Sequence, residues 1–204
     1  MTPMMKFAEL KKAEDAAMGE SLKGSGFRRI AAGTWSRRRG DELNLIQLQP
    51  HSVEKSFCVN LGVHYTFLPK AGTEAPLDRD QIDIHDCEVK LRLTDASGTR
   101  DQWWPMSSSG VDAVAGVVMG RGMQLFHAYR LDGPIAAMDG KDIERGEPGL
   151  LGSLTKVRAC LLLARLHEHA GNHDRCVETA TIGLKLAGLA VGPKKALGDI
   201  LKRS

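Results

Sequence analysis

The sequence is poor in aromatic residues and has no closely spaced cysteines. Phe, Trp and Tyr make up 5% of the 204 residues, so the core must consist mainly of Leu, Val, Ile, Ala and Met. The four cysteines, Cys58, Cys87, Cys160 and Cys176, form no C-x-x-C pair. Such dispersed cysteines are typical of reduced thiols rather than of a disulfide framework. We therefore expect a cytoplasmic protein.

Long apolar runs and a strong net charge are also missing. No apolar run reaches the roughly 18 residues that a membrane-spanning helix requires. The N-terminal stretch has acidic residues and no apolar core of a signal peptide. The net charge of +3 is too small to indicate a nucleic-acid partner by itself. We expect no membrane partner.

The first half of the chain predicts a helix followed by strands with short turns. Apolar residues at helical spacing predict a helix from Met5 to Lys23. A charged turn is expected at Ser36–Glu42 and a bulge near Leu45 and Ile46. The strands are expected at 27–35, 43–50, 57–67 and 88–94, with a short fifth strand at 102–104. Successive strands with short turns indicate an antiparallel meander.

The second half predicts helices. They are expected at 111–131, 151–169 and 174–187, with one short helix after Gly192. Strands followed by helices indicate an α+β fold. We predict an N-terminal helix, then an antiparallel β meander of four to five strands with helices on one face, then a C-terminal helical hairpin. The expected domains are residues 1–145 and residues 146–204.

The expected hairpin carries more apolar surface than its two helices can cover. Leu154, Val157, Leu161, Leu162 and Leu166 form a stripe on its first helix. Exposed leucines would be a liability. The hairpin is therefore expected to dock on the helix at 111–130 or, as the alternative, to form a dimer interface.

The strand at 57–67 alternates more clearly than any other. Phe57, Val59, Leu61, Val63 and Tyr65 point to one side and should face a core. The other side carries Cys58, Asn60, Gly62 and His64, and is expected to be a partner surface or the solvated side of the sheet. The candidate binding residues on that side are Gln47, Asn60, His64, Glu88, Lys90 and Arg92. In the strand at 88–94, Cys87 should be buried, with Arg92 on the opposite face.

Several motifs of the first half resemble the domain-of-unknown-function family 4304. They are G-F-x-R, a Q-x-Q strand, N-L-G-V, a C-x-V strand and a Trp. The matching residues are Gly26, Phe27, Gln47, Asn60, Leu61, Gly62, Val63, Cys87, Arg92 and Trp103. The resemblance covers roughly the first 130 residues. It implies an α+β fold and no particular activity.

The C-terminal stretch from Val157 to Ala187 resembles one tetratricopeptide repeat. The matching residues are Leu163, Ala164, Gly171, Asp174, Cys176, Val177, Leu184 and Leu186. The usual Trp, Tyr and closing Pro are absent, and the sequence holds no second copy. A single repeat cannot bury its own apolar face.

No motif predicts a metal or cofactor site. Cys58, His64, His85 and Cys87 lie on strand positions that cannot converge on one ion. His167, His169 and His173 flank a helix break at Gly171 and Asn172. The glycines of "GVVMGRG" follow no strand of the kind that a nucleotide-binding turn requires.

Three functions therefore stay open. The favoured one is a non-enzymatic binding module whose partner is another protein, present as a monomer or weak homodimer. The alternative is a small hydrolase or nuclease-like enzyme that uses His64, Glu88 and Arg92. The third is RNA binding, in which Trp35 stacks on a base and Arg37, Arg38 and Arg39 contact phosphates.

Overall fold

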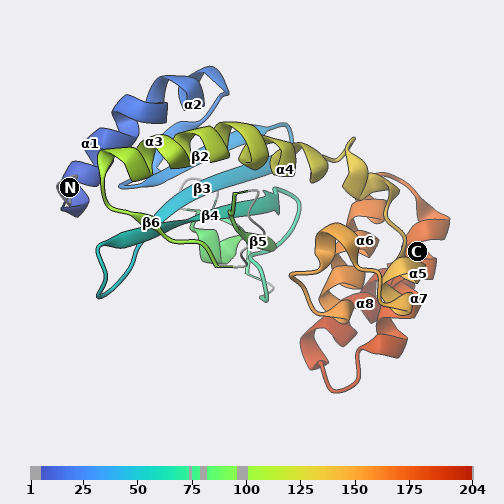
Figure 1. Ribbon diagram of the computed structural model, residues 1–204. Coiled ribbons are helices and arrows are strands. Elements are labelled where there is room, and N and C mark those ends of the chain that lie inside the picture. The colour runs from blue at the N-terminus through green and yellow to red at the C-terminus, as the bar shows by residue number, and fades with distance from the viewer. Residues whose placement is uncertain (1–5, 74, 79–81, 96–100, 204) are drawn as a thin grey trace. The chain divides into compact units, whose positions relative to one another are not determined.

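The chain consists of two compact units. The computed structural model describes residues 6–73, 75–78, 82–95 and 101–203. The first unit comprises Met1–Phe67 and Asp78–Phe126, and the second comprises Leu68–Leu77 and His127–Ser204. Figure 1 shows the labelled elements of both units. The docking predicted for the helical hairpin stays a prediction.

The first unit begins with the predicted helix, which runs through three consecutive segments. These are α1 (Phe7–Glu14), the π-helical turn η1 (Asp15–Gly19) and α2 (Glu20–Gly24). The helix ends at Gly24, and the chain turns away at Gly26, whose φ of 84° suits glycine. The amide of Phe27 then bonds the carbonyl of Leu22 at 2.9 Å and turns the chain toward the sheet.

A six-stranded antiparallel sheet follows among the described residues, and with the flanking helices it confirms the predicted α+β class. The strand order is β1-β2-β3-β4-β5, and β6 also pairs with β4. The strands are β1 (Arg28–Ala31), β2 (Thr34–Arg39), β3 (Glu42–Pro50), β4 (Ser56–Tyr65), β5 (Val89–Arg92) and β6 (Trp104–Pro105).

Two local predictions in the first hairpins are wrong. The expected strand at 27–35 is split into β1 and β2 by a turn, and Ser36–Arg39 belong to β2 rather than to a turn. The expected bulge at Leu45 and Ile46 is absent from the described pairing of β3, which runs in regular register with both neighbours. Its apolar parity changes there because β3 is buried on both faces. The register shift lies instead in β1, between Arg29 and Ala31.

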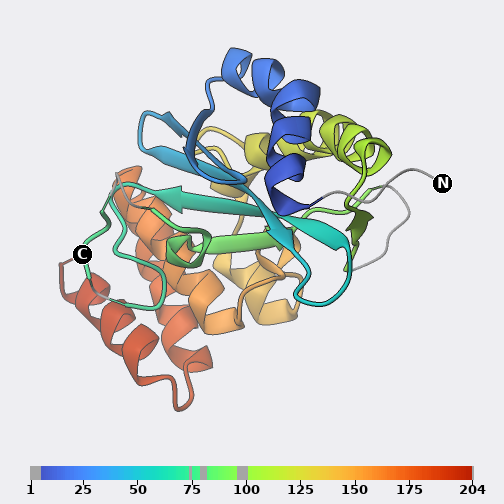
Figure 2. The same cartoon turned by 90° about the vertical axis from the view of Figure 1, so that its left-hand side faces the viewer.

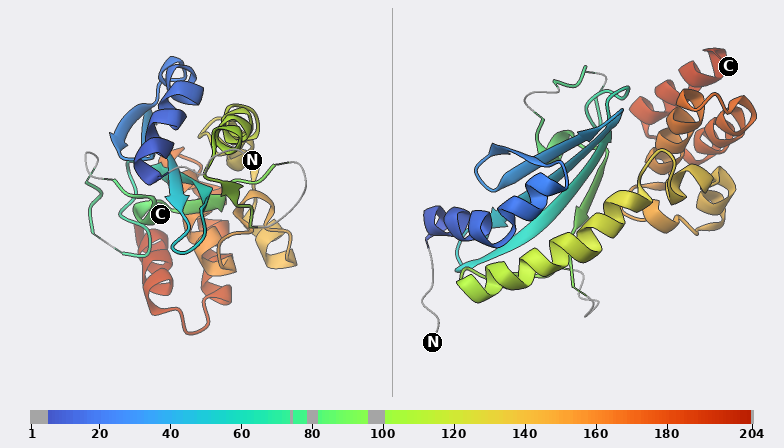
Figure 3. Two further views of the ribbon diagram at one scale, coloured as in Figure 1. Left: turned by 60° about the vertical axis from the view of Figure 1, so that its left-hand side comes forward. Right: turned by 90° about the horizontal axis from the view of Figure 1, so that it is seen from above.

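Helices cover the apolar face of the sheet, as predicted. The second helical run consists of α3 (Ser108–Val117), the π-helical η3 (Val118–Gly122) and α4 (Met123–Ala128). A methyl group on Gly122 would lie 3.9 Å from the side chains of Leu61 and Leu93, so this run packs closely on β4 and on the residue that follows β5. The run also contacts α1, and Figure 3 shows both runs on the same face.

The opposite face of β4 is not the solvated side that the alternation predicts. Cys58 and His64 have no exposed surface. The short 3-10 helix η2 (Ile84–Asp86) and Cys87 lie over Gly62. A methyl group on Gly62 would come within 2.6 Å of Cys87 Sγ and 2.7 Å of Ile84 Cδ1. The prediction fails at these positions because residues distant in sequence cover them: the backbone of Glu88 contacts His64, and the side chain of Arg92 contacts Cys58.

The second unit is helical apart from Leu68–Leu77. It contains η4 (Pro134–Ala137), α5 (Gly140–Arg145), η5 (Gly149–Leu151), α6 (Lys156–His169), α7 (His173–Leu186) and α8 (Val191–Arg203). Helices α6 and α7 form the predicted hairpin. Figure 2 shows α6, α7 and α8 packed together. Among the described residues, no helix is long and apolar enough to cross a membrane.

Helix α8 is longer than the short terminal helix that was predicted. It packs against apolar residues of α6. Leu161 shares a buried cluster with Ala180 of α7 and with Leu197 and Ile200 of α8. Gly183 allows this close packing, because a methyl group there would lie 2.9 Å from both Cys160 Cβ and Leu197 Cδ1. Helix α8 thus covers part of the apolar stripe for which the sequence predicted a partner elsewhere.

Candidate functional site

Three carboxamide side chains meet on the face of the sheet opposite the helices. Gln47 is paired with Asn60 across β3 and β4, and Gln49 follows on the same side of β3. Asn60 Nδ2 donates to Gln47 Oε1 at 3.2 Å and to Gln49 Oε1 at 2.9 Å. We call Gln47, Gln49 and Asn60 the carboxamide patch. Gln49 is exposed, and the other two side chains are half-buried.

The carboxamide patch keeps hydrogen-bonding capacity. Within the described part of the chain, Gln47 Nε2, Gln49 Nε2 and Asn60 Oδ1 make no hydrogen bond. Each primary amide nitrogen offers two protons, and the Asn60 oxygen offers lone pairs. These donors and acceptors match those of a peptide group.

Arg92 borders the patch and connects it to an aromatic side chain. It is the direct neighbour of Asn60 across β4 and β5. Its Nε bonds Asp101 Oδ1 at 3.1 Å, and its guanidinium lies 5.2 Å from the centre of the Trp103 ring. The ring of His51 meets Trp103 edge-on at 4.7 Å. A second guanidinium nitrogen, Nη1, contacts the buried thiol of Cys58.

The other predicted binding residues lie elsewhere on the same face. His64 is fully buried, and its Nδ1 accepts a hydrogen bond of 3.1 Å from the backbone amide of Glu88. Glu88 is also buried. Lys90 is exposed and bonds the carbonyl of His85 at 3.2 Å. Of the six predicted residues, the structure brings Gln47, Asn60 and Arg92 together, and it places His64 and Glu88 beneath the surface.

Cys87 is buried as predicted, but its relation to Arg92 is not the predicted one. The Cys87 thiol lies over Gly62, on the face that also carries Asn60 and Arg92. Strand β5 begins at Val89, so Cys87 stands in the turn after η2, and strand parity does not apply to it. Burial raises the pKa of the Cys87 thiol well above its usual range, which keeps the thiol protonated.

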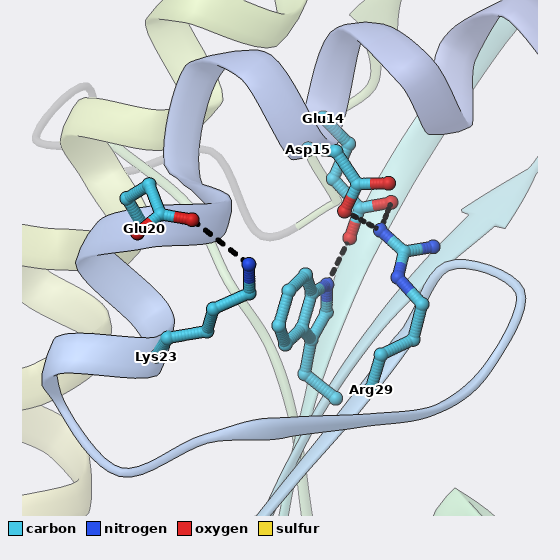
Figure 4. A network of polar contacts seen from close by, with 6 residues as sticks. Glu14, Asp15, Glu20, Lys23 and Arg29 are labelled. Carbon is cyan, nitrogen blue, oxygen red and sulfur yellow. Dashed lines mark hydrogen bonds and ion pairs between the residues drawn. The ribbon is translucent and has the colours of Figure 1, made fainter.

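Trp35 is placed where it cannot stack on a base. It is 1% exposed, and its Nε1 donates to the buried carboxyl group of Glu14. Arg29 bonds Glu14 at 3.2 Å and Asp15 at 2.5 Å, and its guanidinium lies 4.8 Å from the Trp35 ring centre. Figure 4 shows Glu14 and Asp15 turned toward Arg29, while Glu20 and Lys23 form a separate pair. Trp35 is therefore not available for the base stacking that the RNA-binding alternative requires.

The three arginines of β2 lie in two different environments. Arg37 lies against the rings of Phe27 and Phe126, at 4.5 and 5.6 Å, and bonds Asn44 Oδ1 at 2.8 Å. Arg38 and Arg39 are exposed. Arg37 is thus a packing residue, and two arginines are left at the hairpin tip for phosphate contacts.

Among the described residues, no group of three or more His, Cys, Asp or Glu side chains could hold a metal ion.

The comparisons agree with the motifs of the first unit. Residues 18–113 match the family model described as a domain of unknown function, DUF4304. The predicted resemblance is confirmed for this segment, which contains the carboxamide patch, Arg92 and Trp103. No curated protein and no solved structure matches the chain. The resemblance of the α6–α7 hairpin to a tetratricopeptide repeat stays a prediction.

The sequence patterns did not identify Gln49 as a site residue, and they gave no role to Asp101. Gln49 shares the parity of Gln47, which is the signal that could have found it. Asp101 lies outside the strands, and its contact with Arg92 depends on how the chain returns to the sheet after β5. Nothing in the local sequence predicts that contact.

Proposed function

We propose that the first unit is a non-enzymatic protein-binding module, and that its partner lies on the carboxamide patch beside Arg92 and Trp103. The observation that carries the proposal is the set of three adjacent carboxamides with unused hydrogen-bonding atoms in the described structure. They can bond the backbone of a partner chain. Arg and Trp are enriched at the centres of protein interfaces, where they supply much of the binding energy.

The burial of His64 and Glu88 favours binding over catalysis. A general base must reach the proton that it removes. His64 is 0% exposed and uses Nδ1 to hold the backbone at Glu88. It serves to fasten the turn after η2 to the sheet.

We also propose that the protein is cytoplasmic. None of the four cysteines forms a disulfide bond, and all four are buried. Burial raises the pKa of Cys160 to about 11, so this thiol is protonated and poorly reactive at neutral pH. Inert buried thiols suit a reducing compartment.

The test compares matched glutamine substitutions in affinity capture from the native cell. Gln49→Ala and Asn60→Ala alter the patch, while Gln124→Ala removes an exposed glutamine on α4. A protein partner should be retained by wild type and by Gln124→Ala, and lost with the patch variants. Retention of every partner by the patch variants would overturn the proposal. Release of all captured material by ribonuclease would favour the RNA alternative, with Arg38 and Arg39 as the contacts.

A further inference from the structure

The second unit contains a cavity of about 300 Å³ beside the C-terminal end of α6. Leu131, Ile135 and Leu166 provide an apolar lining. His169 and Asn172 also line the cavity and are exposed, so they lie toward its mouth. The volume is at the lower end of those of pockets that hold small molecules.

One buried polar side chain in this lining has an unused atom. His167 is 3% exposed, and its Nε2 has no hydrogen-bond partner within the part of the chain that the structure describes. Buried polar atoms are normally bonded, so an unbonded one requires an explanation. A ligand that occupies the cavity would provide the missing partner.

The contact of the other ring nitrogen, Nδ1, determines whether Nε2 donates or accepts a hydrogen bond. The backbone of Met138 bonds the His167 ring and favours its protonated form, as a carbonyl acceptor does. Since Nε2 is unbonded, the ring donates to this carbonyl through Nδ1. The same carbonyl accepts a hydrogen bond of 2.7 Å from Arg175 Nη2, which fixes its position.

The ring is neutral at physiological pH. Burial and the nearby charge of Arg175 lower the pKa of His167. In a neutral imidazole with its proton on Nδ1, Nε2 carries a lone pair and accepts a hydrogen bond. A largely apolar cavity with one buried, unused acceptor is complementary to an apolar molecule with one donor.

We propose that this cavity binds a small neutral molecule with an apolar body and a single O–H or N–H group, which donates to His167 Nε2. The site lies within the second unit and is independent of the carboxamide patch. The lining contains no Lys, Arg, Asp or Glu side chain, so it provides no ion pair for a charged ligand.

Phenol and toluene test the proposal, since they differ in a hydroxyl and a methyl group. Titrations of the full chain, followed by long-range ¹H–¹⁵N spectra, should show Nδ1 protonated and should show the Nε2 signal shifting with phenol. Phenol should bind roughly two- to tenfold more tightly than toluene, the discrimination expected for one buried hydrogen bond. Equal affinity for the two, no binding of either, or a proton on Nε2 would overturn the proposal.

Two variants make the test specific to the ring nitrogen. His167→Phe should abolish the preference for phenol, while His173→Phe, at an exposed position outside the cavity, should keep it. Retention of the preference by His167→Phe would also contradict the proposal. If His167→Phe does not fold, the comparison of phenol with toluene on the wild-type protein still tests the proposal.

Discussion

At the scale of single residues, Glu14 shows how the first unit handles a buried carboxyl group. Its side chain has no exposed surface, and it contacts Trp35 Nε1 and Arg29. Burial raises the pKa of Glu14, although the bonds from Trp35 and Arg29 oppose the increase. Loss of solvation therefore outweighs these contacts, and ionisation of Glu14 weakens the folded state.

The pKa of Glu14 predicts a definite dependence of stability on pH. Its pKa is higher in the folded state than the 4.5 expected for the unfolded chain, so the folded protein holds this proton more tightly. The contribution of Glu14 is fully present below about pH 4.5 and is lost as the pH rises through the raised pKa. Glu14→Gln retains an acceptor for Trp35 and carries no titrating proton.

Urea denaturation over a series of pH values tests this linkage. The free energy of unfolding of wild type minus that of Glu14→Gln should decrease from pH 4.5 upward and then level off. A difference that grows with pH would mean that Arg29 and Trp35 outweigh the cost of burial.

Gly62 is a second residue whose environment predicts the effect of a substitution, because there is no room for a side chain. An added methyl group would lie within 2.7 Å of two side-chain atoms, Cys87 Sγ and Ile84 Cδ1. We expect Gly62→Ala to destabilise the first unit by about 1–3 kcal/mol through overpacking, and to speed labelling of Cys87. Gly116→Ala is the control, because no atom lies within 4 Å of the added methyl group. In a helix interior it should gain up to about 1 kcal/mol. Equal stability of the two variants would contradict the close packing of Cys87 and Ile84 over Gly62.

At the scale of elements, one arginine holds two segments of the second unit together. Arg175 of α7 donates to the carbonyls of Ala136 and Ala137 at 3.1 Å and of Met138 at 2.7 Å. These carbonyls lie at the end of η4, where a short helix leaves them without partners of its own. The side chain thus caps η4 and orders the wall of the His167 cavity.

Loss of this cap should weaken the second unit. We expect Arg175→Ala to reduce its free energy of unfolding by about 1–3 kcal/mol, because carbonyls bonded to a charged group lose their partner. Arg203→Ala is the control: it removes an exposed ion pair with Glu168, worth at most about 1 kcal/mol. Thermal denaturation followed by circular dichroism measures both. A larger loss from Arg203→Ala would show that the η4 cap contributes little.

At the scale of the whole molecule, stability depends on separate cores in the two units. Leu161 lies in the core of the second unit, among Ala180, Leu197 and Ile200 of the same chain. We expect Leu161→Asp to destabilise the chain by at least about 3 kcal/mol, since it leaves a cavity and an unpaired buried charge. The loss should not depend on protein concentration.

Denaturation at two protein concentrations, with sedimentation analysis, distinguishes the possible results. Leu189→Asp, at a position that is 99% exposed, is the control and should change stability by no more than about 0.5 kcal/mol. Conversion of a folded dimer into a folded monomer by Leu161→Asp would show that the α6 stripe is a partner surface.

The sequence by itself determined the α+β class, the antiparallel order of the strands and the helices of the second half. It did so because periods of 2 and 3.6 residues record which side of an element is buried. The alternation in β4 identified the helix-covered face, and it placed Gln47, Asn60 and Arg92 on the other face. Parity alone did not separate these three residues from His64 and Glu88, which were predicted beside them and are buried.

Only the tertiary structure decided what covers the second face of the sheet. His64 and Cys58 look like surface residues in the pattern, and they are buried because Ile84–Glu88 and Arg92 close over them. Trp35 meets a carboxyl group 21 residues earlier in the chain, and His167 is oriented by Met138 from another element. Periodicity records that a side is buried but carries no information about which distant segment buries it, so these contacts required the folded chain.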